Sequence, residues 1–334
     1  MMAYNLIINN TLVKFQLWRE RSIMLNLKKI LWADDGSKAS ENALKVTEYL
    51  AKTYDSEIIG VYVNDIYYPI TPDYFYFDKY FEEISRKNKN IFTKKFKKIG
   101  TSLSKKKVNF ASKIISGTVA ETIIKTANKS KAGLITIGNT GHGYVTNLLL
   151  GSNALKIIKS SKVPVLSVPE TFKPKKYVIN KILVPIDLAE KNLNSLNFAI
   201  EIAQSTNSSV TILYVLPIAT SFMQFPPSIK EKLIKGIEDE LNKLINEAKE
   251  IAERHNIGMK HRVKKATLPD ITIRKKHLAG MKPSKNITDF ASRNNYDLIV
   301  MNSHNKGMIE DLILGSVTEE VIRSSKCPVI SIKL

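Results

Sequence analysis

The stretch that decides the fold is Ile137–Ser152, IGNTGHGYVTNLLLGS. It follows a short apolar run typical of a buried strand and precedes a run with helical spacing. Within it, Gly138, Gly141, Gly151 and Ser152 follow the pattern G-x2-G-x9-G-S. A glycine loop before a helix N-terminus exposes backbone N–H groups and has no Cβ in the way, so a phosphate can bind there. The alternative explanation is that the glycines only allow tight turns.

Around this loop, the first half of the chain alternates between strand-like and helix-like runs. The expected strands are 29–35, 57–63, 108–115, 133–138 and 165–168. The expected helices begin near Ala39, cover 79–103 and 119–130, and begin again at Gly151, while 66–77 is expected to be an irregular crossover. This alternation predicts a parallel sheet with helices on both faces. Ligands of such sheets bind beyond the carboxyl ends of the strands, where Asp35 and the glycine loop both lie.

The same pattern repeats in the second half. Lys181–Asp187 mirrors Lys29–Asp35, and Leu314–Ser316 mirrors Leu150–Ser152. We therefore predict an α/β protein with two tandem, doubly wound, parallel five-stranded sheets of Rossmann-like type. The predicted segments are an N-terminal extension (1–27), a first domain (28–169), a polar linker (170–177) and a second domain (178–334).

The two halves differ at the glycine loop. Asn302 and Asn305 stand where the first half has Gly138 and Gly141. Asparagine tolerates left-handed backbone angles, but its side chain occupies space that a phosphate would need. The second half is also expected to carry a Lys- and Arg-rich insertion, roughly 268–282. We therefore expect the first half to keep its binding chemistry and the second half to have lost it.

Three features of the first half resemble the universal stress protein family in its tandem, two-domain form. They are the Asp35-Gly36-Ser37 turn, Tyr62-Val63 at the end of the second strand, and the G-x2-G-x9-G-S loop. The resemblance covers almost the whole chain from Lys28, without the extension and the expected insertion. It implies a fold like that of the adenine-nucleotide alpha hydrolases. Because single-domain members typically dimerise through their last strand, the resemblance also implies that the two halves form an intrachain pseudo-dimer through Val165–Val168 and Val329–Ile332. The loop pattern is similar to that of the ATP-binding members, and the second half resembles members that do not retain nucleotide.

The resemblance also implies a set of nucleotide-binding residues at two strand ends, in the loop and at the start of the next helix. They are Ala33, Asp35, Val63, Gly138, Asn139, Gly141, His142, Gly151, Ser152 and Asn153. The strand-end residues match positions near adenine and ribose, and the glycines and Ser152 match positions that contact phosphate and ribose. Asn153 departs from the family, where a β-branched residue is more usual. Alternatives remain: Asp35 as a turn or N-cap residue, and His142 as a solvent-facing loop residue.

Asp34 is a second departure from the family, which more commonly has an apolar residue or threonine there. Two adjacent carboxylates, Asp34 and Asp35, would repel a triphosphate unless Mg²⁺ intervenes or one of them points away.

Composition limits the other classes of function. The 334 residues are 43% hydrophobic and 25% charged, which suits about two globular domains. The net charge is +20, but the lysines are spread, and the densest run, from Lys94 to Lys107, is expected to be a solvated helix face. Because the lysines are spread and no nucleic-acid-binding motif accompanies them, nucleic acid is not an expected partner. No apolar run reaches the roughly 18 residues of a membrane span, so a membrane is not an expected partner either. The single cysteine, Cys327, is expected to be a buried core thiol, which fits a reducing cytoplasm.

The expected function is that of a stress-response or regulatory module that binds ATP, or AMP or ADP, with or without Mg²⁺. One alternative is a slow ATP hydrolase or an adenylyl-transfer enzyme of a related fold. The first-strand turn, however, has no histidine pair and no Walker lysine, and no general base has a positioned partner, so we expect no dedicated catalysis. The other alternative is a structural pairing protein whose loop is vestigial. A protein partner and further homo-oligomers stay open.

Overall fold

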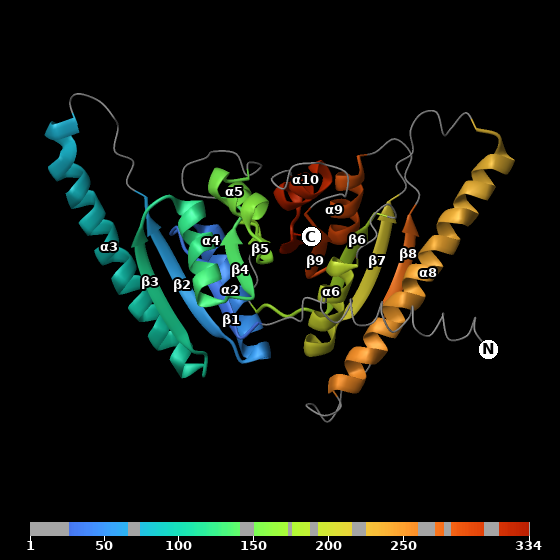
Figure 1. Cartoon of the computed structure of the whole chain (residues 1–334), viewed down its shortest axis with the longest axis horizontal. Coiled ribbons are helices and arrows are strands. Elements are labelled where there is room, and N and C mark those ends of the chain that lie inside the picture. Colours follow the sequence, from blue (N-terminus) through green and yellow to red (C-terminus); the bar gives the residue numbers. More distant parts are fainter. Residues whose placement is uncertain are drawn as a thin grey trace, which may run out of the picture.

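The computed structural model describes residues 27–65, 74–140, 150–172, 176–187, 193–215, 225–259, 271–276, 282–303 and 314–333. Their strands form one ten-stranded sheet in the order β3-β2-β1-β4-β5-β10-β9-β6-β7-β8 (Figure 1). The elements of the first half are β1 (Lys29–Ala33), α2 (Lys38–Tyr54), β2 (Glu57–Asn64), α3 (Tyr74–Lys105), β3 (Phe110–Ser116), α4 (Val119–Ser130), β4 (Leu134–Gly138), α5 (Ser152–Ser160) and β5 (Val165–Val168). Those of the second half are β6 (Lys181–Ile186), α6 (Asn194–Thr206), β7 (Ser209–Val215), α8 (Pro227–Met259), β8 (Ile271–Lys276), α9 (Pro283–Arg293), β9 (Leu298–Asn302), α10 (Ser316–Ser324) and β10 (Val329–Ile332).

The two halves join through their last strands. Within each half, neighbouring strands are parallel, whereas β5 and β10 pair antiparallel, with Leu166 opposite Ile330. An antiparallel seam between two halves of equal strand order gives the sheet an approximate two-fold axis. The prediction of two five-stranded units arranged as an intrachain pseudo-dimer is therefore confirmed, and the two sheets merge into one.

Helices cover both faces of the sheet, as expected for a doubly wound fold. On one face, α2, α3 and α6 pack on a core that runs across both halves, from Ile30 and Leu50 to Ile182 and Ile200. On the other face, α4, α5, α9 and α10 cover a second core. Cys327 lies in this second core, as predicted, and burial raises the pKa of its thiol to about 11.

The structure corrects two expectations about the irregular segments. The expected insertion at 268–282 is partly wrong, because Ile271–Lys276 forms β8, the edge strand equivalent to β3. Its two isoleucines alternate with Thr and Arg and are followed by two lysines, a pattern typical of a charged sheet edge. Because of these basic residues, the segment was interpreted as an insertion and not as a strand. The expected crossover at 66–77 is also partly wrong, because α3 already begins at Tyr74. Residues 66–73 lie outside the described part of the chain.

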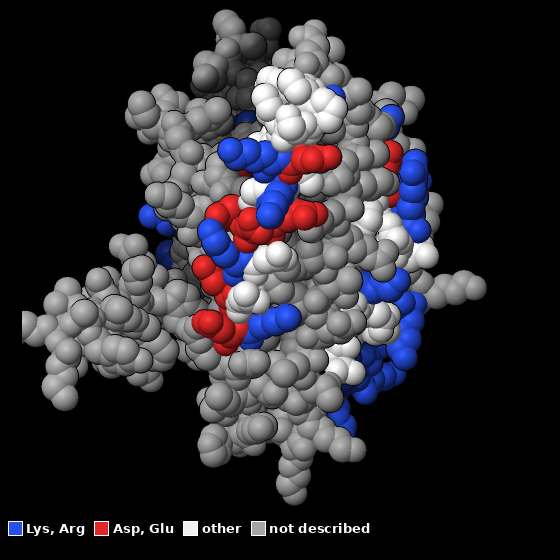
Figure 2. Space-filling model, turned by 90° about the vertical axis from the view of Figure 1, so that its right-hand side faces the viewer, with Lys and Arg blue, Asp and Glu red and all other residues white. Residues whose placement is uncertain are grey.

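Charge is interleaved along the side of the molecule that carries α8. Figure 2 shows acidic and basic side chains next to one another there, and Lys243 and Glu240 of α8 form an ion pair of 2.6 Å. Across the described residues, no helix is long and apolar enough to cross a membrane.

Candidate nucleotide site

The turn between β1 and α2 carries the first group of predicted site residues. Gly36 has a positive φ of 83°, which turns the chain sharply after Asp35. Ser37 is the N-cap of α2, because its Oγ accepts a hydrogen bond from the backbone N–H of Ser40 at 3.1 Å. One carboxylate oxygen of Asp35 accepts from the backbone N–H of Ser37 at 2.9 Å, and the residue is exposed. The cap is therefore Ser37, and Asp35 is held at the open edge of the sheet.

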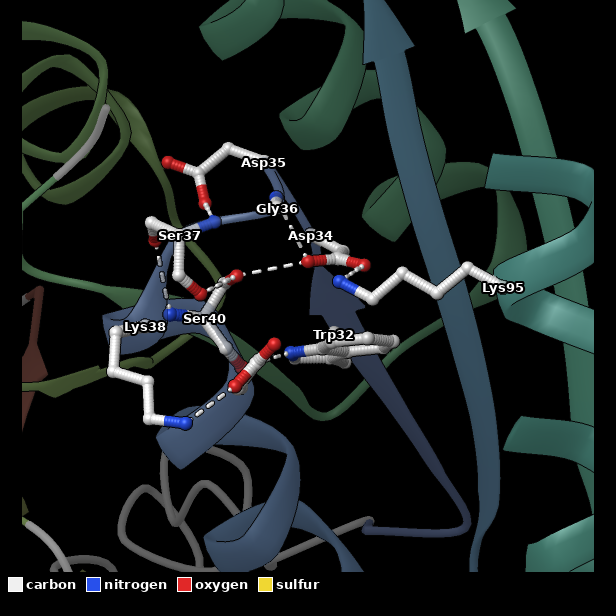
Figure 3. A network of polar contacts seen from close by, with 9 residues as sticks. Trp32, Asp34, Asp35, Gly36, Ser37, Lys38, Ser40 and Lys95 are labelled. Carbon is white, nitrogen blue, oxygen red and sulfur yellow. Dashed lines mark hydrogen bonds and ion pairs between the residues drawn. The ribbon is translucent and has the colours of Figure 1, made fainter. Parts of the chain in front are cut away.

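Asp34 points the other way, into the protein (Figure 3). Its side chain is fully buried, and Oδ1 accepts from the backbone N–H of Gly36 at 3.0 Å and from the Ser40 hydroxyl at 2.8 Å. Its Oδ2 lies 2.7 Å from Nζ of Lys95 on α3. The two adjacent carboxylates therefore diverge, and the charge of Asp34 is compensated inside the fold. This removes the expected repulsion of a triphosphate by Asp34.

Lys95 is the residue that the sequence analysis missed. Its run was expected to be a solvated helix face, but its side chain is only 26% exposed. Its Nζ lies 5.5 Å from the ring centroid of Phe92 and 6.0 Å from that of Trp32, whose Nε1 donates to the backbone oxygen of Ser40. The available signal was position, because Lys95 follows Phe92 by three residues and therefore shares its helix face.

The end of β2 lies beside this network. Val63 is buried, and the Tyr62 ring stacks on Phe92 with their centroids 3.5 Å apart. Partial burial, and then the negative charges of Asp34 and Asp65, raise the pKa of Tyr62. Because β1 pairs with both β2 and β4, the ends of these three strands, with the predicted residues Ala33, Val63 and Gly138, meet at one edge.

Gly138 has a packing role that its sequence pattern did not reveal. A Cβ at this position would lie 2.6 Å from Cβ of Ala39 and 2.7 Å from the backbone nitrogen of Ser40. The first turn of α2 therefore packs directly on the end of β4, and only glycine fits between them. A role for Gly138 in phosphate contact stays a prediction.

The rest of the glycine loop is described only at its ends. Gly141 and His142 lie outside the described residues. Gly151 directly precedes α5, and its backbone N–H donates to the backbone oxygen of Asn139 at 2.8 Å. Ser152 and Asn153 are exposed in the first turn of α5. The two ends of the loop are thus pinned together at the N-terminus of a helix, where the helix dipole favours an anion.

Asn139 connects this loop to the other half of the chain. It is buried, and its backbone N–H donates to the backbone oxygen of Val168 at 3.0 Å. Its side-chain Nδ2 lies 3.4 Å from the backbone oxygen of Ile322 on α10. The Asn139 side chain is therefore directed to the seam between the halves, and its predicted contact with nucleotide stays a prediction.

The second half differs at the equivalent edge. Asn302 replaces Gly138 at the end of β9, and the helix α6 begins at Asn194, which is equivalent to Asn42 of α2. α6 thus begins four residues later than α2, which starts at Lys38. Asn305 and His304 lie outside the described residues.

Metal ligands do not gather at this edge. Across the described residues, no group of three or more His, Cys, Asp or Glu side chains is placed to hold a metal ion. Any Mg²⁺ bound near Asp35 would therefore need further ligands from a bound phosphate.

Comparisons with known proteins agree with this architecture. A universal stress protein of Methanocaldococcus jannaschii is 34% identical over 154 residues, which are 46% of this chain and 81% of that protein. One from Bacillus subtilis is 26% identical over 163 residues, which are 47% of this chain and all of that protein. The crystal structure of a universal stress protein from Archaeoglobus fulgidus has the same fold, with a TM-score of 0.61, 20% identity, and coverage of 92% of this chain and 99% of that one.

The family model matches both halves of the chain. The model of the universal stress protein family matches residues 26–169 and again 179–333, that is, one match for each half. Together with the repeated strand order and the shared seam, these matches show that the chain belongs to the universal stress protein family.

Proposed function

We propose that this protein binds one adenine nucleotide, ATP or a shorter relative, in its first half and acts as a cytoplasmic regulatory module of the stress response. The observation that carries the proposal is the divergence of Asp34 and Asp35 at the end of β1. Asp34 is neutralised by Lys95 inside the fold, whereas Asp35 stays exposed at the sheet edge. The exposed Asp35 carboxylate can accept hydrogen bonds from ribose hydroxyls, while its neighbour Asp34 adds no uncompensated negative charge near the phosphates.

Two further features support the proposal. The backbone bond from Gly151 to Asn139 holds the ends of the glycine loop at the N-terminus of α5, where phosphate oxygens are favoured. The side chain of Val63 near the end of β2 and the methyl group of Ala33 at the end of β1 offer an apolar position for a base beside Asp35. These residues bind and orient; none of them is paired with a general base, so we propose binding without dedicated hydrolysis.

The test is nucleotide retention followed by calorimetry on the full chain. We expect purified protein to bind about one adenine nucleotide per chain with phosphate-dependent affinity, so that ATP binds more tightly than adenosine. Asp35→Ala and Gly141→Val should each abolish or strongly weaken this binding without unfolding the chain, as judged by thermal melting, because the exposed carboxylate and the glycine serve the ligand. The matched control is Asp55→Asn, at an exposed carboxylate beyond the far end of α2, because asparagine tolerates the left-handed conformation of this C-cap residue. Unchanged ATP binding by Asp35→Ala, or two ATP molecules per chain, would contradict the proposal.

A further inference from the structure

The outer edge of the sheet in the first half is open. Among the described strands, β3 pairs only with β2, and Ile58 of β2 donates its backbone N–H to the backbone oxygen of Asn109. In a parallel ladder, the backbone groups of successive residues point alternately toward the neighbouring strand and away from it. Because Asn109 faces β2, the backbone groups of Phe110, Ser112 and Ile114 face the open edge. This edge can therefore pair with a further strand.

A groove lies along this edge, between β3 and α3. Its volume is about 470 Å³, and it opens widely to solvent. The apolar part of its lining consists of Phe96, Phe110 and Ile114, and the polar part includes Thr101 and Ser112. The residues whose backbone groups face the open edge thus also line the groove. An extended segment that paired with β3 would place every second side chain in this groove.

The surface around the groove is strongly basic. Residues 84–120, which include most of α3 and all of β3, contain eleven lysines and arginines but no aspartate or glutamate. Ion pairs compensate two of them, Lys95 and Lys106. The other nine are exposed and form no ion pair with a described residue. The equivalent helix of the second half, α8, has six basic and seven acidic residues, so the excess of positive charge is particular to the edge of the first half.

This charge decides among the possible occupants. A second copy of the chain would bring β3 or the other edge strand, β8, to the groove, and both strands carry basic but no acidic residues. The N-terminal segment 1–26 has three basic residues and one acidic residue, so it is repelled as well. Nucleic acid cannot pair with a strand edge, and Phe96, which is 2% exposed, offers no ring face on which a base can stack. An acidic polypeptide satisfies both the charge and the open edge.

We propose that an acidic, extended segment of another protein pairs with the open edge of β3 as an additional strand. Because successive side chains of a strand point to opposite faces, one set of its side chains lies in the groove over Phe110 and Ile114 and is aliphatic. The other set lies on the opposite face, beside the exposed Lys113, and carries carboxylates. The partner segment is therefore an alternation of aliphatic and acidic residues, about as long as the seven residues of β3. The inference holds whether or not the first half binds ATP.

The test measures amide hydrogen exchange of the full chain by NMR, with the end-blocked peptide Val-Glu-Val-Glu-Val-Glu-Val as the probe. A peptide of this size binds with a Kd on the order of 0.1 mM, so about 2 mM is close to saturation. We expect the exchange of the Ser112 and Ile114 N–H groups to slow about tenfold, because these groups face the open edge. The N–H of Lys113 is already bonded to β2 and should change little.

Two other ligands separate strand pairing from simple attraction of negative charge. The peptide Gly-Glu-Gly-Glu-Gly-Glu-Gly has the same charge but neither the β propensity nor the aliphatic side chains of the probe, so it should bind at least about tenfold more weakly. A single-stranded oligothymidine of twelve nucleotides represents nucleic acid and should leave the exchange of Ser112 and Ile114 unchanged. Equal affinity of the glycine peptide, or slower exchange of both residues with the oligonucleotide, overturns the proposal.

Two variants with matched controls locate the binding, with affinity measured by the fluorescence anisotropy of the labelled probe. Ser112→Pro removes an N–H that faces the open edge, where proline is tolerated, and Lys113→Glu reverses the charge beside the added strand; each should weaken binding about tenfold or more. Ser112→Ala keeps the N–H, and Lys285→Glu makes the same change of net charge at an exposed position of the second half, so both should bind the probe as the unaltered protein does. Lys113→Glu decides alone if Ser112→Pro does not fold. Unchanged exchange at about 2 mM probe, or affinity that survives Lys113→Glu, overturns the proposal.

Discussion

The ion pair between Lys95 and Asp34 makes a sharp prediction about stability. Replacing Lys95 by methionine keeps the length and packing of the side chain but removes its charge. The Asp34 carboxylate, which is fully buried, would then keep its bonds from Gly36 and Ser40 but lose its only described cation. Breaking a buried pair by removing one partner typically costs about 3–5 kcal/mol, since it leaves an uncompensated charge.

The expected magnitude is somewhat smaller here because the Lys95 side chain is 26% exposed, so water already screens part of the interaction. We expect Lys95→Met to lower the free energy of unfolding by about 2–4 kcal/mol. Asp34→Asn should cost less, about 1–2 kcal/mol, because the amide oxygen still accepts both hydrogen bonds and Lys95 can turn to solvent. The double variant should lose about 1–3 kcal/mol less unfolding free energy than the two single variants lose together, and this difference is the coupling energy of the pair.

The measurement is urea denaturation of the four proteins of this cycle, followed by circular dichroism. The matched control is Lys97→Met, because Lys97 is exposed on the same helix and its change should stay within about 0.5 kcal/mol. A loss below about 1 kcal/mol for Lys95→Met, or a coupling near zero, would refute the reasoning that Asp34 depends on this cation. ATP affinity provides a second reading, since an unpaired Asp34 would repel the phosphates.

Three other outcomes follow from the structure. Gly138→Ala should cost about 1–3 kcal/mol, because its Cβ would collide with the first turn of α2; thermal melting measures this, and an unchanged melting temperature would contradict the packing role. Cutting the chain within linker 170–177 should give halves that co-purify through β5 and β10, whereas stable separate monomers would exclude that seam as the main contact. Because burial raises the pKa of Cys327 to about 11, the folded protein keeps this proton where the unfolded chain loses it, so stability should fall from about pH 9 to 11. Cys327→Val introduces the residue found at the equivalent position, Val163, and should reduce the fall in unfolding free energy between these pH values by about 2 kcal/mol in urea titrations. An identical pH profile of the variant would argue against a contribution from this thiol.

Sequence patterns predicted the elements whose signal is local. Apolar runs bounded by turn residues indicated β1, β2, β4 and β5, and the internal repeat indicated their counterparts in the second half. The seam was predicted from the family resemblance. β8 was not predicted, because edge strands commonly carry charged residues and its lysines and arginine resemble those of a loop. The pattern could not distinguish an edge strand from a basic insertion without its partner β7.

Predictions of the site reached the correct edge of the sheet but not the interactions within it. Asp35 lies at that edge, whereas the burial of Asp34 depends on Lys95, which is sixty-one positions away in the chain and belongs to another element. Gly138 was assigned to phosphate approach, and its contact with α2 became visible only once the helix was placed. Both contacts arise from the packing of different elements, and the periodicity of residues along one element carries no information about such packing.

The seam between β5 and β10 has an evolutionary consequence. In a symmetric pair of identical chains, one stretch of DNA encodes both sites, so every substitution appears twice and neither site can change alone. Here the two partners are covalently joined and separately encoded, and each already occupies the strand edge of the other. Gly138 and Asn302, or Asn153 and Val317, can therefore differ within one molecule. Covalent linkage thus frees one site to drift toward a new ligand while the other stays under selection.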